Sequence, residues 1–163
     1  MSQFYKIKVA EIRKESEDAV SLAFEINQDL SSEFNYKPGQ YLTLKFMING
    51  EEERRSYSLC SSPYIDDLHR VAVKKVENGK VSTYINDHLN EGDIVEVMPP
   101  QGNFTLDINE ENEKLYVAFA AGSGITPIMS MISSVIKKEL KSKFVLFYGN
   151  KSADLTIFKS ELD

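Results

Sequence analysis

The hydrophobic pattern changes near residue 110, and this change constrains the fold more than any other feature of the sequence. Before that point, six short segments are predicted as strands, among them residues 4–13, and the alternation of apolar and polar residues is clearer over 18–26 and 41–48. Turn signals such as Asn49-Gly50 separate them. Six short strands within about 100 residues predict a closed antiparallel barrel.

After residue 114 the pattern becomes that of an α/β protein. Leu115–Ala121 is a continuous apolar run, which is typical of a parallel strand covered on both faces. A glycine turn over residues 122–127 follows, then a helix with an apolar stripe, and a second strand over residues 144–148. This order is the opening unit of a nucleotide-binding sheet. We therefore predict a β plus α/β chain, in which the barrel precedes the start of a Rossmann-like parallel sheet.

A polar, acidic segment over residues 107–114 separates the two patterns. Segments of this kind commonly join domains, and 163 residues leave room for one domain and a piece of a second. We place a barrel domain at residues 1–108 and a partial nucleotide-binding domain at residues 113–163.

Charge and cysteine content exclude several classes of function. The net charge of −6 argues against a nucleic-acid partner, because phosphate backbones require clustered Lys and Arg. The single cysteine forms no intrachain disulfide and fits a reducing compartment, so we expect a cytoplasmic protein. One cysteine cannot hold an iron–sulfur cluster in this chain. His69 and His88 lie in no ligand pattern, so no metal site is expected.

Residues 115–136 carry no charge and are long enough to cross a bilayer. Gly122-Ser123-Gly124 and Thr126-Pro127 interrupt this stretch, so a buried strand, a turn and a helix explain it better. We expect no membrane partner, and the amino terminus has no apolar core typical of a signal peptide.

The stretch Arg55–Pro63 carries the first chemical signal. Strand alternation places Arg55, Tyr57 and Leu59 on one face, which offers a cation for a phosphate and an aromatic ring beside it. A flavin dinucleotide requires both, but an ordinary half-exposed strand has the same composition. Cys60 is expected to be a buried apolar side chain rather than a redox centre, because a lone thiol has no resolving partner.

Two helix starts carry the second signal. Ser82 is predicted as the N-cap of a short helix, next to Lys80, and such a start favours phosphate binding. A purely structural cap explains the same residues equally well. In the glycine turn, Thr126 is predicted at a cap and Pro127 at the first helical position.

Together these stretches resemble the ferredoxin-NADP reductase superfamily, along the whole chain and in the same order. The family's Arg-x-Tyr-Ser motif, which holds FAD, matches Arg55-Ser56-Tyr57-Ser58. Its Gly-x-x-Ser phosphate turn matches Gly79-Lys80-Val81-Ser82, and its Pro-x-Gly-x-Phe motif matches Pro100-Gln101-Gly102-Asn103-Phe104. Its nicotinamide-side turn is similar to Gly122–Pro127. The resemblance implies a six-stranded Greek-key FAD-binding barrel followed by an NAD(P)-binding domain.

The resemblance also implies a role for each matched residue. Arg55 neutralises the FAD diphosphate and Tyr57 packs against the flavin ring. Ser58 bonds the reactive edge of the flavin, although strand alternation alone would turn it away, and Thr126 lies where nicotinamide meets flavin. Ser58 and Thr126 are thus the implied catalytic residues. The other implied cofactor contacts are Ser56, Val73, Lys74, Lys80, Val81 and Ser82 for FAD, and Gly122, Gly124 and Lys151 for NAD(P)H.

Two features differ from the most similar branch of the family, reductases that serve an oxygenase in phenylacetate degradation. Members of this branch have arginine after Tyr-Gly-Asn, where this chain has Lys151, which leaves the choice between NADPH and NADH open. The chain also ends at Asp163, within the second domain, so we expect a fragment whose nucleotide domain is incomplete. The 2Fe-2S domain of this branch would then belong to the absent part or to a partner.

The resemblance implies that NAD(P)H reduces FAD and that the flavin passes electrons to an iron–sulfur acceptor of an oxygenase, with phenylacetyl-CoA as the final substrate class. The alternative is a non-catalytic barrel that serves as a binding module without flavin. The incomplete parallel sheet would expose an unpaired edge, which favours self-association.

Overall fold

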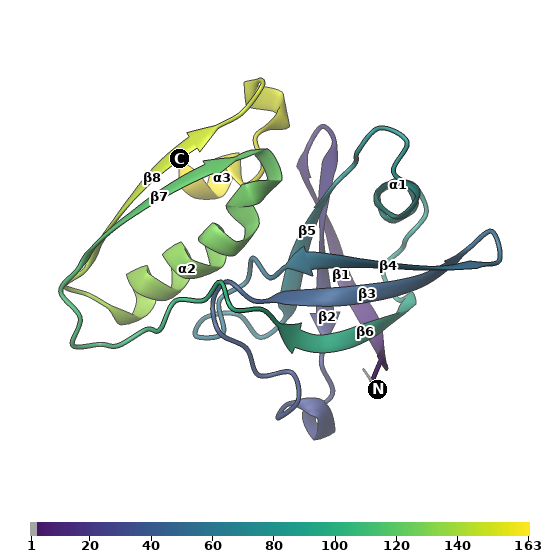
Figure 1. The fold of residues 1–163 in the computed structure, drawn as a ribbon, viewed down its shortest axis with the longest axis horizontal. Coiled ribbons are helices and arrows are strands. Elements are labelled where there is room, and N and C mark those ends of the chain that lie inside the picture. The colour runs from purple at the N-terminus through teal and green to yellow at the C-terminus, as the bar shows by residue number, and fades with distance from the viewer. Residues whose placement is uncertain (1–2) are drawn as a thin grey trace.

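The computed structural model describes residues 3–163, whose strands form two separate sheets (Figure 1). The larger sheet is antiparallel, with the order β4-β3-β6-β1-β2-β5. Its strands are β1 (Tyr5–Ser16), β2 (Ala19–Glu25), β3 (Tyr41–Ile48), β4 (Glu51–Ser58), β5 (His69–Lys74) and β6 (Ile94–Gln101). A bridge between Leu59 and Val71 joins the two ends of this order. The predicted six-stranded antiparallel barrel is confirmed.

Alternation along the strands builds the barrel core. In β3, Leu42, Leu44 and Phe46 are buried, and the residues between them are only partly buried. Every other residue of a strand points to the same face, so one face of each strand supplies the core. These side chains pack with buried residues of all the other barrel strands except β4, which contributes the half-buried Tyr57.

The short helix α1 (Lys80–Asp87) covers one end of the barrel, and Val81 and Ile85 are buried in the core. Its N-cap is Gly79, so the prediction of Ser82 as the N-cap is wrong. The Ser82 hydroxyl lies inside the first turn, where it accepts a hydrogen bond from Val76 N at 3.2 Å and donates to Gly79 O at 3.4 Å. It therefore binds the backbone before the helix instead of capping the helix.

The second sheet contains β7 (Leu115–Ala121) and β8 (Lys143–Gly149), which pair in parallel. Between them the chain forms the 3-10 turn η2 (Gly122–Gly124) and the helix α2 (Ile125–Lys138), as the strand–turn–helix interpretation predicted. Thr126 and Pro127 are the second and third residues of α2, so their predicted places at the cap and the first position are wrong. The η2 turn leads directly into the helix, which moves its start to Ile125.

Only one face of the two-stranded sheet is covered in the described chain, which differs from the expectation for the run 115–121. Tyr116, Ala118 and Ala120 face α2, but Leu115, Val117 and Phe119 are exposed. On β8 the exposed partner of Phe119 is Phe147, whose ring stacks on it at 4.8 Å between centroids. No helix within residues 3–163 is long and apolar enough to cross a membrane.

Helix α2 lies between the small sheet and the barrel and joins them (Figure 1). Ser130 Oγ donates to Ser61 O at 2.6 Å, and the Ser62 and Ser134 hydroxyls lie 2.8 Å apart. Ile125, Ile128 and Met131 of the helix pack in one cluster with Cys60 and Ala72 of the barrel side. Apolar contact and buried hydroxyl pairs thus fix the two sheets against each other.

The remaining elements are short. They are the 3-10 turns η1 (Gln28–Leu30) and η3 (Ala153–Leu155), and the helix α3 (Lys159–Leu162). The segment around η3 returns to the barrel, where Glu17 N donates to Asp154 O at 3.0 Å. Ile157 and Phe158 are buried beside Ala19 of β2.

Candidate functional site

A cleft of about 470 Å³ lies where the barrel meets the start of α2. Strands β4 and β5, the turn before α1 and the η2–α2 junction contribute its walls. Its lining residues are Arg55, Ser56, Tyr57, Ser58, Ala72, Lys74, Val76, Gly79, Lys80, Val81, Ser82, Ser123, Gly124, Thr126 and Pro127.

Three cations line this cleft, and each has a carboxylate partner. Arg55 Nη2 lies 3.3 Å from Glu53 Oε2, and Lys80 Nζ lies 2.8 Å from Glu51 Oε2. The hydrogen bond to Glu51 is the main reason that the pKa of Lys80 is raised, and a second one to Glu53 adds to it. Lys74 Nζ lies 3.3 Å from Asp18 Oδ2, and Asp18 does not itself line the cleft. All three cations can pair with a ligand anion.

Tyr57 is the aromatic group of the cleft. Its ring packs against the barrel core, opposite Leu42 of β3. Burial raises the pKa of Tyr57 to about 12, and the charge of Arg55 opposes this rise. The phenol therefore stays neutral over the physiological range. Ser58, the last residue of β4, also lines the cleft, although simple strand alternation would turn it away from Tyr57.

The turn before α1 has no space for a side chain at Gly79. A Cβ atom built there would overlap Ser82 Oγ and Val76 Cγ2. Gly79 is nevertheless one of the residues that line the cleft. A glycine at a helix start next to Lys80 favours the close approach of a phosphate.

The start of α2 forms the opposite wall. Thr126 is buried and its Oγ1 donates to Ser123 O at 3.0 Å, which fixes the first turn of the helix. The free backbone N–H groups of a helix start favour an anion, and α2 is long enough for this effect. Two helix starts and two exposed cations therefore face one cleft beside a half-buried ring. This donor set fits a dinucleotide that has a diphosphate and an aromatic ring system.

Most residues that the resemblance indicated lie in this cleft. They are Arg55, Ser56, Tyr57, Ser58, Lys74, Lys80, Val81, Ser82, Gly124 and Thr126. Three others do not line it. Val73 is fully buried in the barrel core, Gly122 accepts a hydrogen bond from Tyr148 Oη at 2.9 Å, and Lys151 is exposed after β8.

The sequence interpretation missed Ala72 and Val76, which also line the cleft. Ala72 shares a strand face with Lys74, so the spacing of two residues on β5 was the available signal. Val76 lies beyond the end of β5 and had no such signal.

A second hollow of about 450 Å³ adjoins the first and shares Gly79 and Lys80 with it. Its other lining residues are Met47, Ile48, Asn49, Asn78, Thr83, Tyr84 and His88. The phosphate-favouring turn therefore has a hollow on each side, and a ligand longer than a mononucleotide can occupy both.

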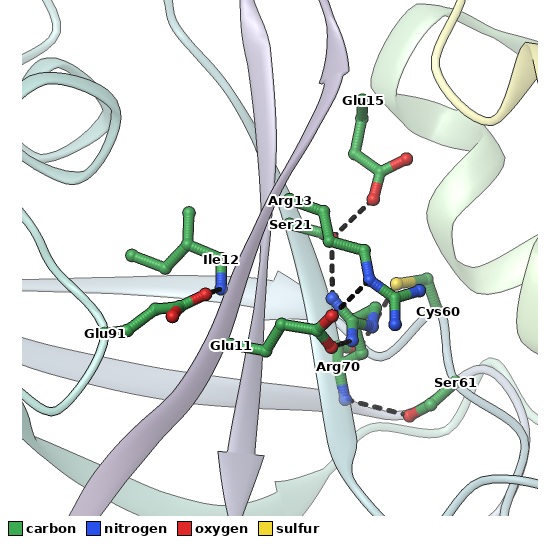
Figure 2. A network of polar contacts seen from close by, with 9 residues as sticks. All are labelled: Glu11, Ile12, Arg13, Glu15, Ser21, Cys60, Ser61, Arg70 and Glu91. Carbon is green, nitrogen blue, oxygen red and sulfur yellow. Dashed lines mark hydrogen bonds and ion pairs between the residues drawn. The ribbon is translucent and has the colours of Figure 1, made fainter.

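A separate polar network lies beside β1, β2 and β5, on the side that faces α2 (Figure 2). Arg70 pairs with Glu11 and donates to Ser21 Oγ at 2.9 Å, and Arg13 Nε lies 2.6 Å from Glu11 Oε1. These hydrogen bonds, first that of Arg13, lower the pKa of Glu11 although burial opposes them. The network connects the barrel to the loop that α2 contacts, and none of its residues lines the cleft.

Cys60 belongs to this network through Sγ, which donates to Arg70 O at 3.3 Å. The thiol is buried, and burial raises its pKa, so the reactive thiolate is disfavoured. This agrees with the expected role as a buried apolar side chain. Within residues 3–163 no group of three or more His, Cys, Asp or Glu side chains could hold a metal ion.

Comparison with known proteins gives two family matches. Residues 6–106 match the model of the oxidoreductase FAD-binding domain, and residues 119–163 match that of the oxidoreductase NAD-binding domain. Each match covers the part of the chain that contributes one wall of the cleft.

Several known proteins are similar over nearly the whole chain. One subunit of the 1,2-phenylacetyl-CoA epoxidase of Escherichia coli K12 is 41% identical over 99% of this chain and 45% of its own length. The ferredoxin reductase component of the 3-ketosteroid-9-alpha-monooxygenase of Rhodococcus rhodochrous is 36% identical over 96% of this chain and 44% of its own length. The solved structure of phthalate dioxygenase reductase superposes with a TM-score of 0.81, at 32% identity, over 98% of this chain and 47% of that one. The chain thus spans about half the length of these relatives.

Proposed function

Because this chain belongs to the oxidoreductase FAD-binding domain family, we propose that it binds FAD in the cleft and receives electrons from NAD(P)H. The observation that carries this proposal is the meeting of Arg55, Lys80 and the start of α2 beside the half-buried Tyr57. An isolated helix start or surface cation would be ordinary. Their convergence at one aromatic side chain is what a flavin dinucleotide requires.

Different residues of the chain would contact different parts of FAD. Arg55 and Lys80 hold the diphosphate by charge-assisted contacts, and the backbone of the turn at Gly79 lies directly behind it. The adjoining hollow that contains Tyr84 is large enough for the adenosine, which favours FAD over FMN. Backbone groups next to Val73 add contacts from β5, because Ala72 and Lys74 line the cleft on either side of it.

When bound, a flavin can accept two electrons from a nicotinamide and pass them one at a time to other acceptors. The protein orients the flavin for these steps. Tyr57 packs against the ring system as a neutral phenol. Ser58 hydrogen-bonds the reactive edge from the end of β4. Thr126, fixed by its bond to Ser123 O, holds the place where nicotinamide meets the flavin and keeps water out.

The nicotinamide side is supported by the match of residues 119–163 to the NAD-binding domain family. We propose that Gly122 and Gly124 lie under the NAD(P)H diphosphate and that Lys151 contacts the adenosine end. Lysine offers a single point charge instead of the arginine fork, so it fits NADPH and NADH with little discrimination.

The electron acceptor is proposed from the relatives. One is named as a subunit of an epoxidase of phenylacetyl-CoA, and another as a ferredoxin reductase component of a monooxygenase. The phthalate dioxygenase reductase is described as a modular structure for electron transfer from pyridine nucleotides to a 2Fe-2S centre. We infer that an iron–sulfur acceptor outside this chain carries electrons to an oxygenase that acts on phenylacetyl-CoA, in the cytoplasm. The domains are proposed at residues 1–108 and 113–163.

The test of this function is the spectrum and the reduction of the purified protein. We expect a yellow protein that releases FAD, and a flavin that dithionite bleaches more readily than NADPH does. The reason is that within residues 3–163 the second sheet contains two strands, β7 and β8, so few elements here support a nicotinamide site. Anaerobic stopped-flow, beside a form extended past Asp163, measures this. A colourless protein without affinity for flavin would support the non-catalytic barrel. Equal rates with NADPH would contradict the expected defect.

A further inference from the structure

Glu53 of β4 contacts both cations that the proposed function assigns to the FAD diphosphate. Its Oε2 lies 3.3 Å from Arg55 Nη2, and its Oε1 lies 3.3 Å from Lys80 Nζ. Glu53, Arg55 and Tyr57 are two residues apart along the strand, so they share the face that leads to the cleft.

Burial separates Glu53 from its acidic neighbours. The Glu53 side chain is 16% exposed, whereas the side chains of Arg55 and Lys80 are 54% and 57% exposed. Glu51 also contacts Lys80, but its side chain is 68% exposed. The anchored partner of the two cations is therefore Glu53, and water screens its charge less than that of Glu51.

We propose that Glu53 is an internal counter-anion that competes with the FAD diphosphate for Arg55 and Lys80 and thereby sets the affinity for FAD. This inference rests on the proposed function, because it assumes that the two cations bind that diphosphate. Each cation that turns to a phosphate oxygen must share or leave a Glu53 oxygen. A carboxylate that stays beside the diphosphate also repels it.

The competition has a clear sign. Removal of the Glu53 charge frees both cations and removes a like charge from the phosphate position, so affinity for FAD should rise. The effect should depend on the phosphates of the ligand, because Tyr57 and the ring-binding wall are unchanged. It should also weaken as the salt concentration rises, since both cations are more than half exposed.

Glu52 provides a matched control next to Glu53 in the sequence. It lies on the opposite face of β4, where it pairs with Arg54 at 2.6 Å and with Lys45 at 3.8 Å. None of these three residues lines the cleft. The Glu52→Gln variant has the same change in net charge as Glu53→Gln, but it leaves the proposed phosphate site intact.

The experiment is a titration of the flavin-free protein with FAD and with riboflavin, followed by the quenching of flavin fluorescence. We expect Glu53→Gln to bind FAD about five- to tenfold more tightly than the wild type, about 1–1.4 kcal/mol. Glu52→Gln should stay within about twofold of the wild type, and neither variant should change the affinity for riboflavin. Thermal unfolding of each variant without flavin checks the fold, and Glu53→Ala replaces Glu53→Gln if the latter is unstable.

The outcomes separate the two proposals. If the wild type does not bind FAD, or binds it no better than riboflavin, the proposed diphosphate site is wrong. A second outcome is that the wild type prefers FAD but Glu53→Gln binds FAD no more tightly than the wild type does. Glu53 then orients the cations or has no effect, and the proposal that it competes with the diphosphate is wrong. A gain that also occurs with riboflavin, or with Glu52→Gln, likewise overturns it.

Discussion

At the scale of single residues, two neighbouring arginines of β4 offer a test of the phosphate contact. Arg55 lines the cleft, whereas Arg54 pairs with Glu52 and lies 5.0 Å from the ring of Phe4 on the other face. Arg55→Ala should remove a charge-assisted hydrogen bond of about 1.5–3 kcal/mol. The dissociation constant for FAD, measured by fluorescence titration, should rise about 10- to 100-fold. Arg54→Ala removes the same charge and should have little effect, so equal losses would contradict the assignment.

His69 predicts a pH dependence of stability. Its Nε2 lies 2.7 Å from Phe34 O, and burial lowers its pKa below the usual 6.5, although this hydrogen bond opposes the shift. As the pH falls, the unfolded chain therefore takes up a proton before the folded chain does. The contribution of His69 to the free energy of unfolding should be fully present above about pH 6.5, the usual pKa of histidine. It should be lost as the pH falls through the lower pKa that His69 has in the folded protein.

Urea unfolding at several pH values measures this dependence. The His69→Gln variant should lose the part of the slope that lies below pH 6.5. His88 is exposed after α1, so His88→Gln is the matched control and should keep the wild-type slope. A His69→Gln profile that is parallel to the wild type would show that His69 does not contribute.

Side-chain chemistry made part of the site predictable from the sequence. Arg55 and Tyr57 were found because strand alternation places a cation and a ring on one face. Ser82 was assigned the wrong local role, because sequence cannot tell a hydroxyl that caps a helix from one that bonds the backbone before it. Val76 was missed because it lies outside any alternating segment, so its sequence surroundings do not indicate that it lines a cleft.

At the scale of elements, the turn before α1 depends on the absence of a side chain at Gly79. Gly79→Ala would force Cβ against Ser82 Oγ and Val76 Cγ2, so the turn must move. Overpacking of this kind costs about 1–3 kcal/mol, and we expect weaker FAD binding as well. Gly149→Ala meets no atom within 4 Å and should change stability by at most about 0.5 kcal/mol. Urea denaturation of both variants measures the difference, and equal values would refute the steric argument.

The type and order of the elements followed from periodicity, but their ends and coverage did not. The strand at residues 41–48 was predicted with its exact bounds, because alternation there is regular. The run 115–121 indicated a strand covered on both faces, since its side chains are apolar on both. The exposed half of that strand follows from the absence of a second layer among the described residues, which no local pattern records.

At the scale of the whole molecule, the uncovered face of β7 and β8 should cause self-association. Phe119 and Phe147 are 76% and 54% exposed and stack on each other. Contiguous apolar side chains on a sheet favour contact with a second surface. The mean mass in sedimentation should rise with concentration, and Phe119→Glu should reduce that rise. Ile94→Glu, at an exposed apolar position on the barrel strand β6, is the control and should leave it unchanged. A monomer at every concentration would refute the prediction.

The strand order has a consequence for how the chain folds during its synthesis. The last barrel strand to be made, β6, pairs with β3 on one side and β1 on the other. Without β6, the strand pairs leave the β3–β4 hairpin and the β1–β2–β5 sheet, which the Leu59–Val71 bridge and the packing of α1 connect. Because β6 lies in the middle of the strand order, we expect the barrel that bears Arg55 and Lys74 to close only after β6 has been made. A chain that stops before residue 94 would lack Val95 and Val97, so the core that the two halves share would be incomplete.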